Sequence, residues 1–190
     1  FMDYGDLEQF AYRLFYGKDG IKTKKAYETA ELYDEIYIDE YQDVNRIQEL
    51  IFNAISKDGR NIFMVGDVKQ SIYRFRQAMP EIFIAKMDEF VPYDGKTYPA
   101  KLQLSRNFRS RDGVTDFINY IFALIMSRDM GEILYDEEHM LFPGAEYPES
   151  RGKESEIVLI ETGESAAESL RQEAGYVAAR IAQMLTDGTT

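Results

Sequence analysis

The fold is decided by residues 36–43, Ile36-Tyr37-Ile38-Asp39-Glu40-Tyr41-Gln42-Asp43. This short apolar run ends in two adjacent carboxylates, and an amide and a third carboxylate follow within three residues. The run predicts a β-strand over residues 35–39, with Asp39 and Glu40 at its carboxyl end. There, one carboxylate can approach a hydrated magnesium ion while its neighbour orients a water molecule. The stretch therefore predicts part of a magnesium–nucleotide site, the alternative being a strand that ends in two solvated acids.

The segment that follows predicts a parallel α/β sheet. Asn45 is expected to cap a helix with its apolar residues on one face, and residues 61–65 form a second short apolar strand. Strand–helix–strand at this spacing is typical of parallel sheets, in which ligands bind beyond the carboxyl ends of the strands. Two polar clusters, residues 39–43 and residues 66–70, fall at those ends. The pattern therefore favours one ligand site built from both clusters.

The rest of the chain predicts further helices and short strands. Helices are expected at residues 6–16, with Asp6 as the N-cap, and at residues 26–33, 80–90, 112–126 and 166–185. Strands are expected at residues 101–104 and 157–160. The loop at residues 91–99 is the candidate domain boundary, and residues 144–153 indicate a Pro/Gly/Glu-rich linker.

The composition indicates a folded globular protein. The 190 residues are 45% hydrophobic and include no cysteine, which excludes disulfides and thiolate metal sites and favours a reducing cytoplasm. No apolar run approaches the roughly 18 residues of a membrane span, and no signal peptide is visible. The net charge of −12 disfavours a polyanionic partner, but residues 60–111 hold ten Lys/Arg and five Asp/Glu. That basic stretch can face a nucleic acid, or it can be chance clustering on an acidic surface.

Two further clusters combine arginines with aromatic side chains. Residues 65–76 end in Ile72-Tyr73-Arg74-Phe75-Arg76, in which arginine can meet phosphate while tyrosine stacks on a base of single-stranded nucleic acid. The alternative is a turn followed by a segment with Ile72 and Phe75 buried. Residues 104–111 carry three arginines beside an aromatic residue. They can clamp phosphates, or they can coat the start of the next helix.

The order and spacing of three segments resemble a known family. The segments are Ile-Asp-Glu-Tyr-Gln-Asp from residue 38, Val-Gly-Asp-Val-Lys-Gln-Ser-Ile-Tyr-Arg-Phe-Arg from residue 65, and Asn-Phe-Arg-Ser from residue 107. They resemble motifs II, III and IV of superfamily 1 DNA helicases of the UvrD/Rep type. Together with Gly131-Glu132 and Pro143-Gly144-Ala145, the wording is similar to the AddA component of the bacterial AddAB (RexAB) helicase–nucleases.

The resemblance implies roles in a nucleotide site for four residues near the strand ends. Asp39 would hold magnesium, and Glu40 would activate the hydrolytic water. Gln42 would couple the nucleotide site to the rest of its domain. Gln70 would sense the γ-phosphate. The implied cofactors are therefore ATP and Mg²⁺.

The resemblance also implies roles for the arginine–aromatic clusters. Phe108 would lie against adenine, and Arg109 would be the arginine finger. Tyr73 would stack on a base of the translocating DNA strand, with Arg74 and Arg76 nearby. Many relatives have tyrosine where Phe108 stands, and phenylalanine keeps the stacking face. Gln77 replaces a glycine that is common in the wider family.

The implied fold is α/β, a RecA-like (P-loop NTPase-type) parallel sheet with flanking helices. Residues 1–95 would be the C-terminal part of a first motor domain with motifs II and III. Residues 96–190 would open a second motor domain with motif IV, and the two would meet near residues 92–101. The start at Phe1 suggests a piece of a longer protein.

The implied function is that of one component of an ATP-dependent DNA helicase/exonuclease in double-strand break repair and recombination. It would couple ATP hydrolysis to movement along single-stranded DNA in the bacterial cytoplasm, with double-stranded DNA and a second protein of the AddB/RexB type as partners. No Gly-x-x-x-x-Gly-Lys-Ser/Thr occurs in the sequence, so the chain alone is expected to be inactive. A non-catalytic DNA-binding or assembly domain is the alternative, and a magnesium-dependent nuclease using Asp39, Glu40 and Asp43 is a third reading.

Overall fold

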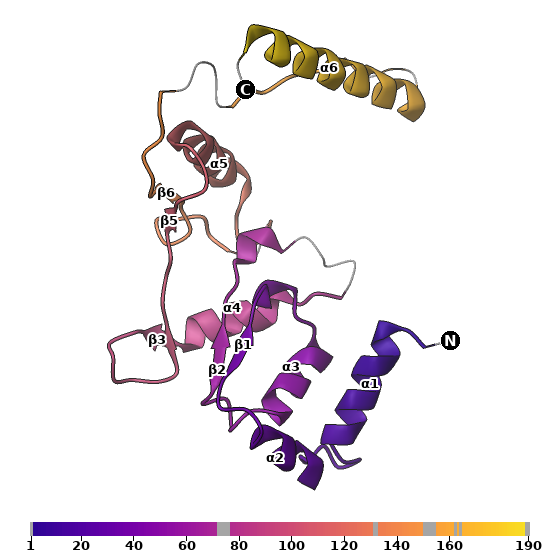
Figure 1. Cartoon of the computed structure of the whole chain (residues 1–190), viewed down its shortest axis with the longest axis vertical. Helices are drawn as coiled ribbons and strands as arrows, with labels where there is room; N and C mark the ends of the chain where they lie inside the picture. Colours follow the sequence, from indigo (N-terminus) through magenta and orange to yellow (C-terminus); the bar gives the residue numbers. More distant parts are fainter. Residues whose placement is uncertain are drawn as a thin grey trace. The chain divides into compact units, whose positions relative to one another are not determined.

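The computed structural model of the chain describes residues 2–71, 77–130, 133–149, 155–161, 163 and 165–188. The chain divides into two compact units. Unit 1 comprises Phe1–Gln103 with Arg128–Ile133, and unit 2 comprises Leu104–Ser127 with Leu134–Thr190 (Figure 1). Each unit is described by itself.

Unit 1 is built around two short parallel strands. Strand β1, Ile36–Ile38, pairs with β2, Ile62–Met64, in the register Ile36 opposite Ile62 and Ile38 opposite Met64. Helix α3, Arg46–Ala54, connects them, and Asn45 caps it by accepting a hydrogen bond from the backbone N–H of Gln48 (2.9 Å). The predicted parallel strand–helix–strand arrangement is confirmed. The sheet in the described residues is small, with these two strands only.

The core of unit 1 lies where the strand ends meet helix α4. Helix α1, Tyr4–Phe15, helix α2, Lys24–Ala30, and α3 contact one another, and α4, Pro80–Glu89, contacts the turn after β1. The buried core side chains are those of Ile38, Tyr41, Val44 and Ile82. Two of them lie in the turn after β1, so burial of apolar surface fixes the backbone that carries the acidic residues.

One predicted helix boundary is wrong. Helix α1 begins at Tyr4 and its N-cap is Asp3, not Asp6. The Asp3 carboxylate accepts from the backbone N–H of Asp6 (2.9 Å), and the Asp6 carboxylate accepts from that of Asp3 (3.1 Å). This reciprocal pair is a capping box, and Asp6 is its third helical residue.

The loop predicted at residues 91–99 has paired ends. Strand β3, Val91–Pro92, lies parallel to β4, Ala100–Lys101. The strand expected at residues 101–104 therefore begins one residue earlier and is shorter. Between the two strands, Asp94 closes a tight turn by accepting hydrogen bonds from the backbone N–H groups of Lys96 and Thr97.

Unit 2 joins a short parallel strand pair to a helix. Strand β5, Arg106–Asn107, pairs with β6, Phe142–Pro143, and helix α5, Asp112–Ile125, contacts β6. The side chain of Asn119 on α5 donates to the carbonyl of Leu141 (2.8 Å) and accepts from its N–H (2.9 Å). Asn119 therefore fixes the chain just before β6.

The strand predicted at residues 157–160 is wrong. The structure assigns no strand to residues 155–161, and Leu159 is 94% exposed. Four apolar residues form a strand only when a neighbouring strand accepts their backbone hydrogen bonds, and residues 155–161 have none beside them.

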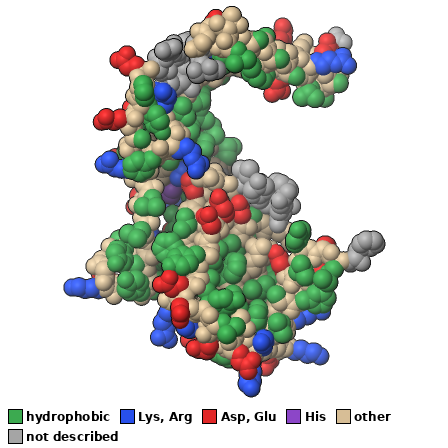
Figure 2. All heavy atoms as spheres, in the orientation of Figure 1, with side chains coloured by type: hydrophobic (Ala, Val, Ile, Leu, Met, Phe, Trp, Pro, Cys, Tyr) green, Lys and Arg blue, Asp and Glu red, His purple; other side chains and the backbone are tan. Residues whose placement is uncertain are grey.

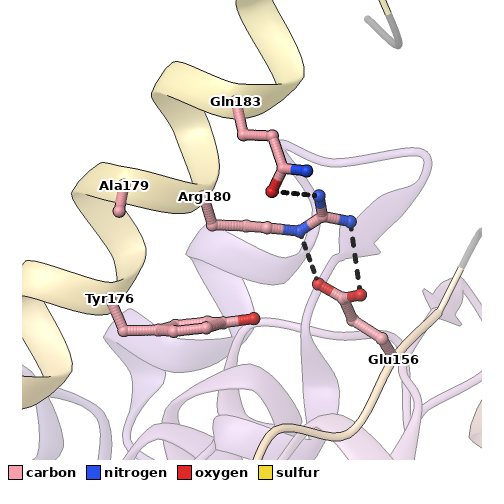
Figure 3. A pocket seen from close by; sticks show the side chains of 5 residues that line it. All are labelled: Glu156, Tyr176, Ala179, Arg180 and Gln183. Carbon is pink, nitrogen blue, oxygen red and sulfur yellow. Dashed lines mark hydrogen bonds and ion pairs between the residues drawn. The ribbon is translucent and has the colours of Figure 1, made fainter. Parts of the chain in front are cut away.

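Helix α6, Ala166–Asp187, is held to this extended segment by one ion pair. Arg180 donates from Nε and Nη2 to the two carboxylate oxygens of Glu156 (2.8 and 3.2 Å), and from Nη1 to Gln183 (3.3 Å) (Figure 3). Tyr176 and Ala179 line the same hollow. Because the guanidinium of Arg180 is already paired, the hollow offers no spare cation for a ligand.

Much apolar surface lies in solvent in the described part of the chain. Figure 2 shows apolar side chains spread over the face in view. The exposed apolar residues of α6 are Leu170, Val177, Ile181 and Leu185. No helix of the described residues is long and apolar enough to cross a membrane.

Candidate functional site: the strand-end loops and the Phe108 turn

The carboxyl ends of β1 and β2 are joined by backbone hydrogen bonds. Val65 N–H donates to the carbonyl of Ile38 (2.9 Å), and Tyr41 N–H donates back to the carbonyl of Val65 (2.9 Å). These two bonds continue the ladder past the strands, so residues 39–42 and residues 66–70 leave the sheet at the same edge. We call these two segments the strand-end loops.

Glu40 has a strained backbone and an exposed side chain. Its φ of 52° and ψ of 42° lie in the left-handed region, which costs a non-glycine residue roughly 1–3 kcal/mol. The conformation is held because Glu40 N–H donates to Asp39 Oδ1 (2.9 Å), while the following turn packs into the core. Strain of this kind is concentrated at functional sites. The structure thus presents Asp39 and Glu40 together at the rim of the sheet.

Gln42 bridges the two strand-end loops. Its side chain is 1% exposed, and both ends are hydrogen-bonded. Nε2 donates to Glu40 Oε2 (2.7 Å), and Oε1 accepts from the backbone N–H of Asp67 (2.9 Å). One buried amide therefore fixes the orientation of the Glu40 carboxylate relative to the second loop.

Gly66 is required because the loops approach closely. A Cβ at this position would lie 2.7 Å from Gln42 Oε1, 3.0 Å from Phe83 Cε1 and 3.2 Å from the backbone nitrogen of Gln42. Its φ is not in the left-handed region, so conformational freedom is not the reason for glycine here. Gly66 leaves the space that the Gln42 amide occupies.

Asp67 organises the second loop. Its carboxylate accepts from the backbone N–H of Lys69 (3.1 Å), from Lys69 Nζ (2.9 Å) and from Gln70 Nε2 (3.1 Å). The last bond fixes the exposed Gln70 side chain on the loop that Gln42 contacts. Neither Gly66 nor Asp67 was predicted as a site residue, although both belong to the Val-Gly-Asp-x-x-Gln pattern.

Asp43 differs from the two exposed acids. In the part of the chain that the structure describes, its Oδ1 is buried and has no hydrogen-bond partner. Burial raises the pKa of the Asp43 carboxyl, and the nearby negative charge of Glu40 raises it further. The described residues contain no group of three acidic or histidine side chains that could hold a metal. The nuclease reading, which needs Asp39, Glu40 and Asp43 around one ion, is therefore wrong.

Phe108 and Arg109 lie in a turn of unit 2, after β5. The side chain of Asn107 forms this turn by accepting from the backbone N–H groups of Arg109 and Ser110 (both 2.8 Å). Phe108 is 66% exposed, and Arg109 is exposed as well. The predicted DNA-contacting residues Tyr73, Arg74 and Arg76 lie outside the described residues.

Comparison with known proteins identifies the relatives of this sequence. Residues 1–91 match the UvrD/REP helicase N-terminal domain. Residues 1–91 belong to that helicase family. Similarity to the AddA-type component of an ATP-dependent helicase/nuclease covers nearly the whole chain in Staphylococcus carnosus (42% identical over 188 residues, 97% of this chain), Bacillus pumilus (40% over 201 residues, 97%) and Carboxydothermus hydrogenoformans (41% over 199 residues, 99%). The chain spans 15–16% of the length of these relatives.

The donor set of this UvrD/REP-type segment fits a hydrated magnesium ion. Asp39 is exposed, and its Oδ1 accepts from Glu40 N–H, while no bond to Oδ2 occurs among the described residues. Magnesium prefers oxygen ligands, keeps several of its waters and is usually held by one or two carboxylates together with substrate phosphates. A single open carboxylate oxygen at the loop edge matches that requirement.

Proposed function

We propose that this chain acts as a segment of a longer ATP-driven DNA helicase–nuclease polypeptide. In it, the strand-end loops form one wall of the nucleotide site. The observation that carries the proposal is the buried Gln42 amide, which links the Glu40 carboxylate to the loop of Gln70. A solvated strand end has no need of a strained Glu40, a buried bridging amide and a glycine at the contact.

The fold proposal follows from the same residues. Unit 1 would be the C-terminal part of a first RecA-like motor domain, and unit 2 the start of a second, as the resemblance of residues 1–95 and 96–190 implies. The parallel pairing of β1 with β2 and the ligand-facing loops at their carboxyl ends support this assignment.

The geometry suggests how the chain's residues contribute to ATP hydrolysis. Gln42 donates to Glu40 Oε2, which leaves Oε1 to accept a proton from the attacking water. As that proton moves to Glu40, the water oxygen bonds to the γ-phosphorus, and the bond to ADP breaks. Asp39 would orient the waters around Mg²⁺, which when bound neutralises charge on the phosphate oxygens.

The remaining residues would connect this reaction to DNA. Gln70, held by Asp67, is placed to report on the γ-phosphate, because its loop shares the Gln42 bridge with Glu40. Arg109 would stabilise the transferring charge, and Phe108 would stack on adenine. Tyr73, Arg74 and Arg76 would contact single-stranded DNA next to Gln70 in the sequence. The names of the relatives support a second protein as partner and a nuclease activity in the full-length polypeptide.

DNA-stimulated ATP hydrolysis tests this proposal. We expect the full-length polypeptide that contains this sequence to hydrolyse ATP in the ordinary enzymatic range of about 1–10³ s⁻¹ when single-stranded DNA is present. We expect the 190-residue chain alone to show only the background rate, because it carries no phosphate-cradling glycine loop. Phosphate release, measured with and without DNA, reports both.

Two results would contradict the proposal. One is DNA-stimulated turnover by the 190-residue chain alone. The other is full-length polypeptide that binds DNA but neither binds nor hydrolyses ATP, which would favour the non-catalytic DNA-binding alternative.

A further inference from the structure

Gly144 lies directly beside the Phe108 ring in unit 2. The backbone N–H of Phe142 donates to the carbonyl of Ser105 (2.9 Å), and that of Gly144 donates to the carbonyl of Asn107 (2.8 Å). These bonds lay residues 142–144 along β5 and its turn. The segment was predicted to be part of a linker from residue 144 onward, and at Gly144 that prediction is wrong.

The contact is with the face of the ring. A Cβ on Gly144 would lie 2.8 Å from Phe108 Cε1 and 2.9 Å from both of its neighbours, Cδ1 and Cζ. A point in the plane of the ring cannot be nearly equidistant from three consecutive ring atoms at that range, whereas a point above the face can. Gly144 therefore backs one face of Phe108, and any side chain there would push the ring away.

The rest of the segment holds the same turn. Tyr147 Oη donates to the carbonyl of Phe108 (3.0 Å). The guanidinium of Arg111 lies 5.2 Å from the centre of the Tyr147 ring and donates to the carbonyl of Pro148. With Asn119 fixing Leu141 at the other end, residues 142–147 are anchored on both sides of Gly144.

Phe108 is left as a platform with one open face. One face is covered by Gly144, and yet the residue is 66% exposed, so the exposed part includes the opposite face. An exposed aromatic face with a fixed tilt suits a flat, uncharged aromatic ligand, because stacking depends on the ring's orientation.

We propose that residues 142–147 are a back wall that sets the tilt of Phe108 for stacking on a nucleotide base, with Gly144 as the positioning residue. This inference rests on the proposed function, in which Phe108 meets adenine. It assigns to a glycine outside the helicase-like motifs a role in recognising the base and none in recognising the phosphates.

The test compares two ligands that differ in the base. In the full-length polypeptide, Gly144→Ala should weaken ATP binding by about 5- to 20-fold, the range expected for loss of one stacked base. Binding of inorganic tripolyphosphate, which has no base, should not change. Because Gly144 does not have a left-handed φ and Phe108 can swing into solvent, alanine should displace the ring without unfolding the unit.

Three further variants complete the test. Gly175→Ala is the matched control, since nothing lies within 4 Å of a Cβ there, and it should leave both affinities unchanged. Tyr147→Phe removes only the hydroxyl that holds the Phe108 carbonyl and should weaken ATP binding in the same direction by a smaller factor. In a Phe108→Ala background, Gly144→Ala should have no further effect on ATP binding.

The outcomes separate this inference from the proposed function. Equal weakening of ATP and tripolyphosphate by Gly144→Ala, or no weakening of either, overturns the back-wall role. If Phe108→Ala weakens ATP binding and Gly144→Ala does not, only this inference is lost. If the unsubstituted polypeptide binds no ATP, the proposed function fails and this inference fails with it.

Discussion

Glu40→Gln in the full-length polypeptide is expected to lower the rate of ATP hydrolysis by at least about 100-fold, the lower end of what a positioned general base contributes. Glutamine has the same shape but cannot take a proton from the attacking water. The Gln42 bridge lies one residue beyond the change and holds Asp67 independently, so the loop should keep its place. ATP binding should therefore be unchanged, and single-turnover hydrolysis measured beside equilibrium ATP binding reports both quantities.

The control for this variant is Glu89→Gln, an exposed acid at the end of α4. It makes the same chemical change in unit 1 away from the strand-end loops and should leave hydrolysis unaltered. If Glu40→Gln retained more than about a tenth of the unsubstituted rate, Glu40 would not be the base. Loss of ATP binding together with hydrolysis would instead assign Glu40 to ground-state binding.

Gly66→Ala is expected to produce the largest loss of stability of any single methyl addition to the strand-end loops. The added carbon would lie 2.7 Å from Gln42 Oε1, and that oxygen cannot retreat, because the amide is buried and bonded at both ends. Overpacking of this kind costs about 1–3 kcal/mol. For a chain of this size each kcal/mol lowers Tm by about 2–4 °C, which thermal unfolding of the 190-residue chain can measure.

A double-variant cycle identifies the cause. Gly66→Ala should be much less destabilising in a Gln42→Ala background, since the nearest contact is then gone. Gly175→Ala, with open space around its Cβ, should leave stability unchanged or slightly raise it. Equal effects of Gly66→Ala with and without Gln42 would mean that Phe83 and the backbone, rather than the bridging amide, set the packing at Gly66.

The sequence predicted best what neighbouring residues determine. Asn45 and Gln48 form a reciprocal cap within four residues, so the start of α3 was predictable. The same local chemistry misled at α1, because Asp3 and Asp6 can each act as a cap and only the backbone path selects Asp3. At residues 157–160 the apolar pattern was correct for a strand, but a strand also needs a neighbour that no local pattern supplies.

For the candidate site, the pattern located the charged residues and missed those that act through space. Asp39 and Glu40 follow a strand, and that placement can be read from the apolar run before them. The need for glycine at residues 66 and 144 arises from Gln42 and Phe108, which lie 24 and 36 residues away in the sequence. A close approach between distant residues leaves no mark on the local sequence, so both glycines became visible only in the structure.

The most direct measurement of the central claim, that the strand-end loops carry the magnesium–nucleotide site, is the Mg²⁺ dependence of ATP binding in Asp39→Asn. Loss of this carboxylate should raise the Mg²⁺ concentration needed for half-maximal binding by about 10- to 100-fold in the full-length polypeptide. ATP binding in the presence of a chelator should be unchanged, because Asp39 would contact ATP only through the hydrated ion. An unaltered Mg²⁺ requirement, or equal weakening with and without Mg²⁺, would contradict the account.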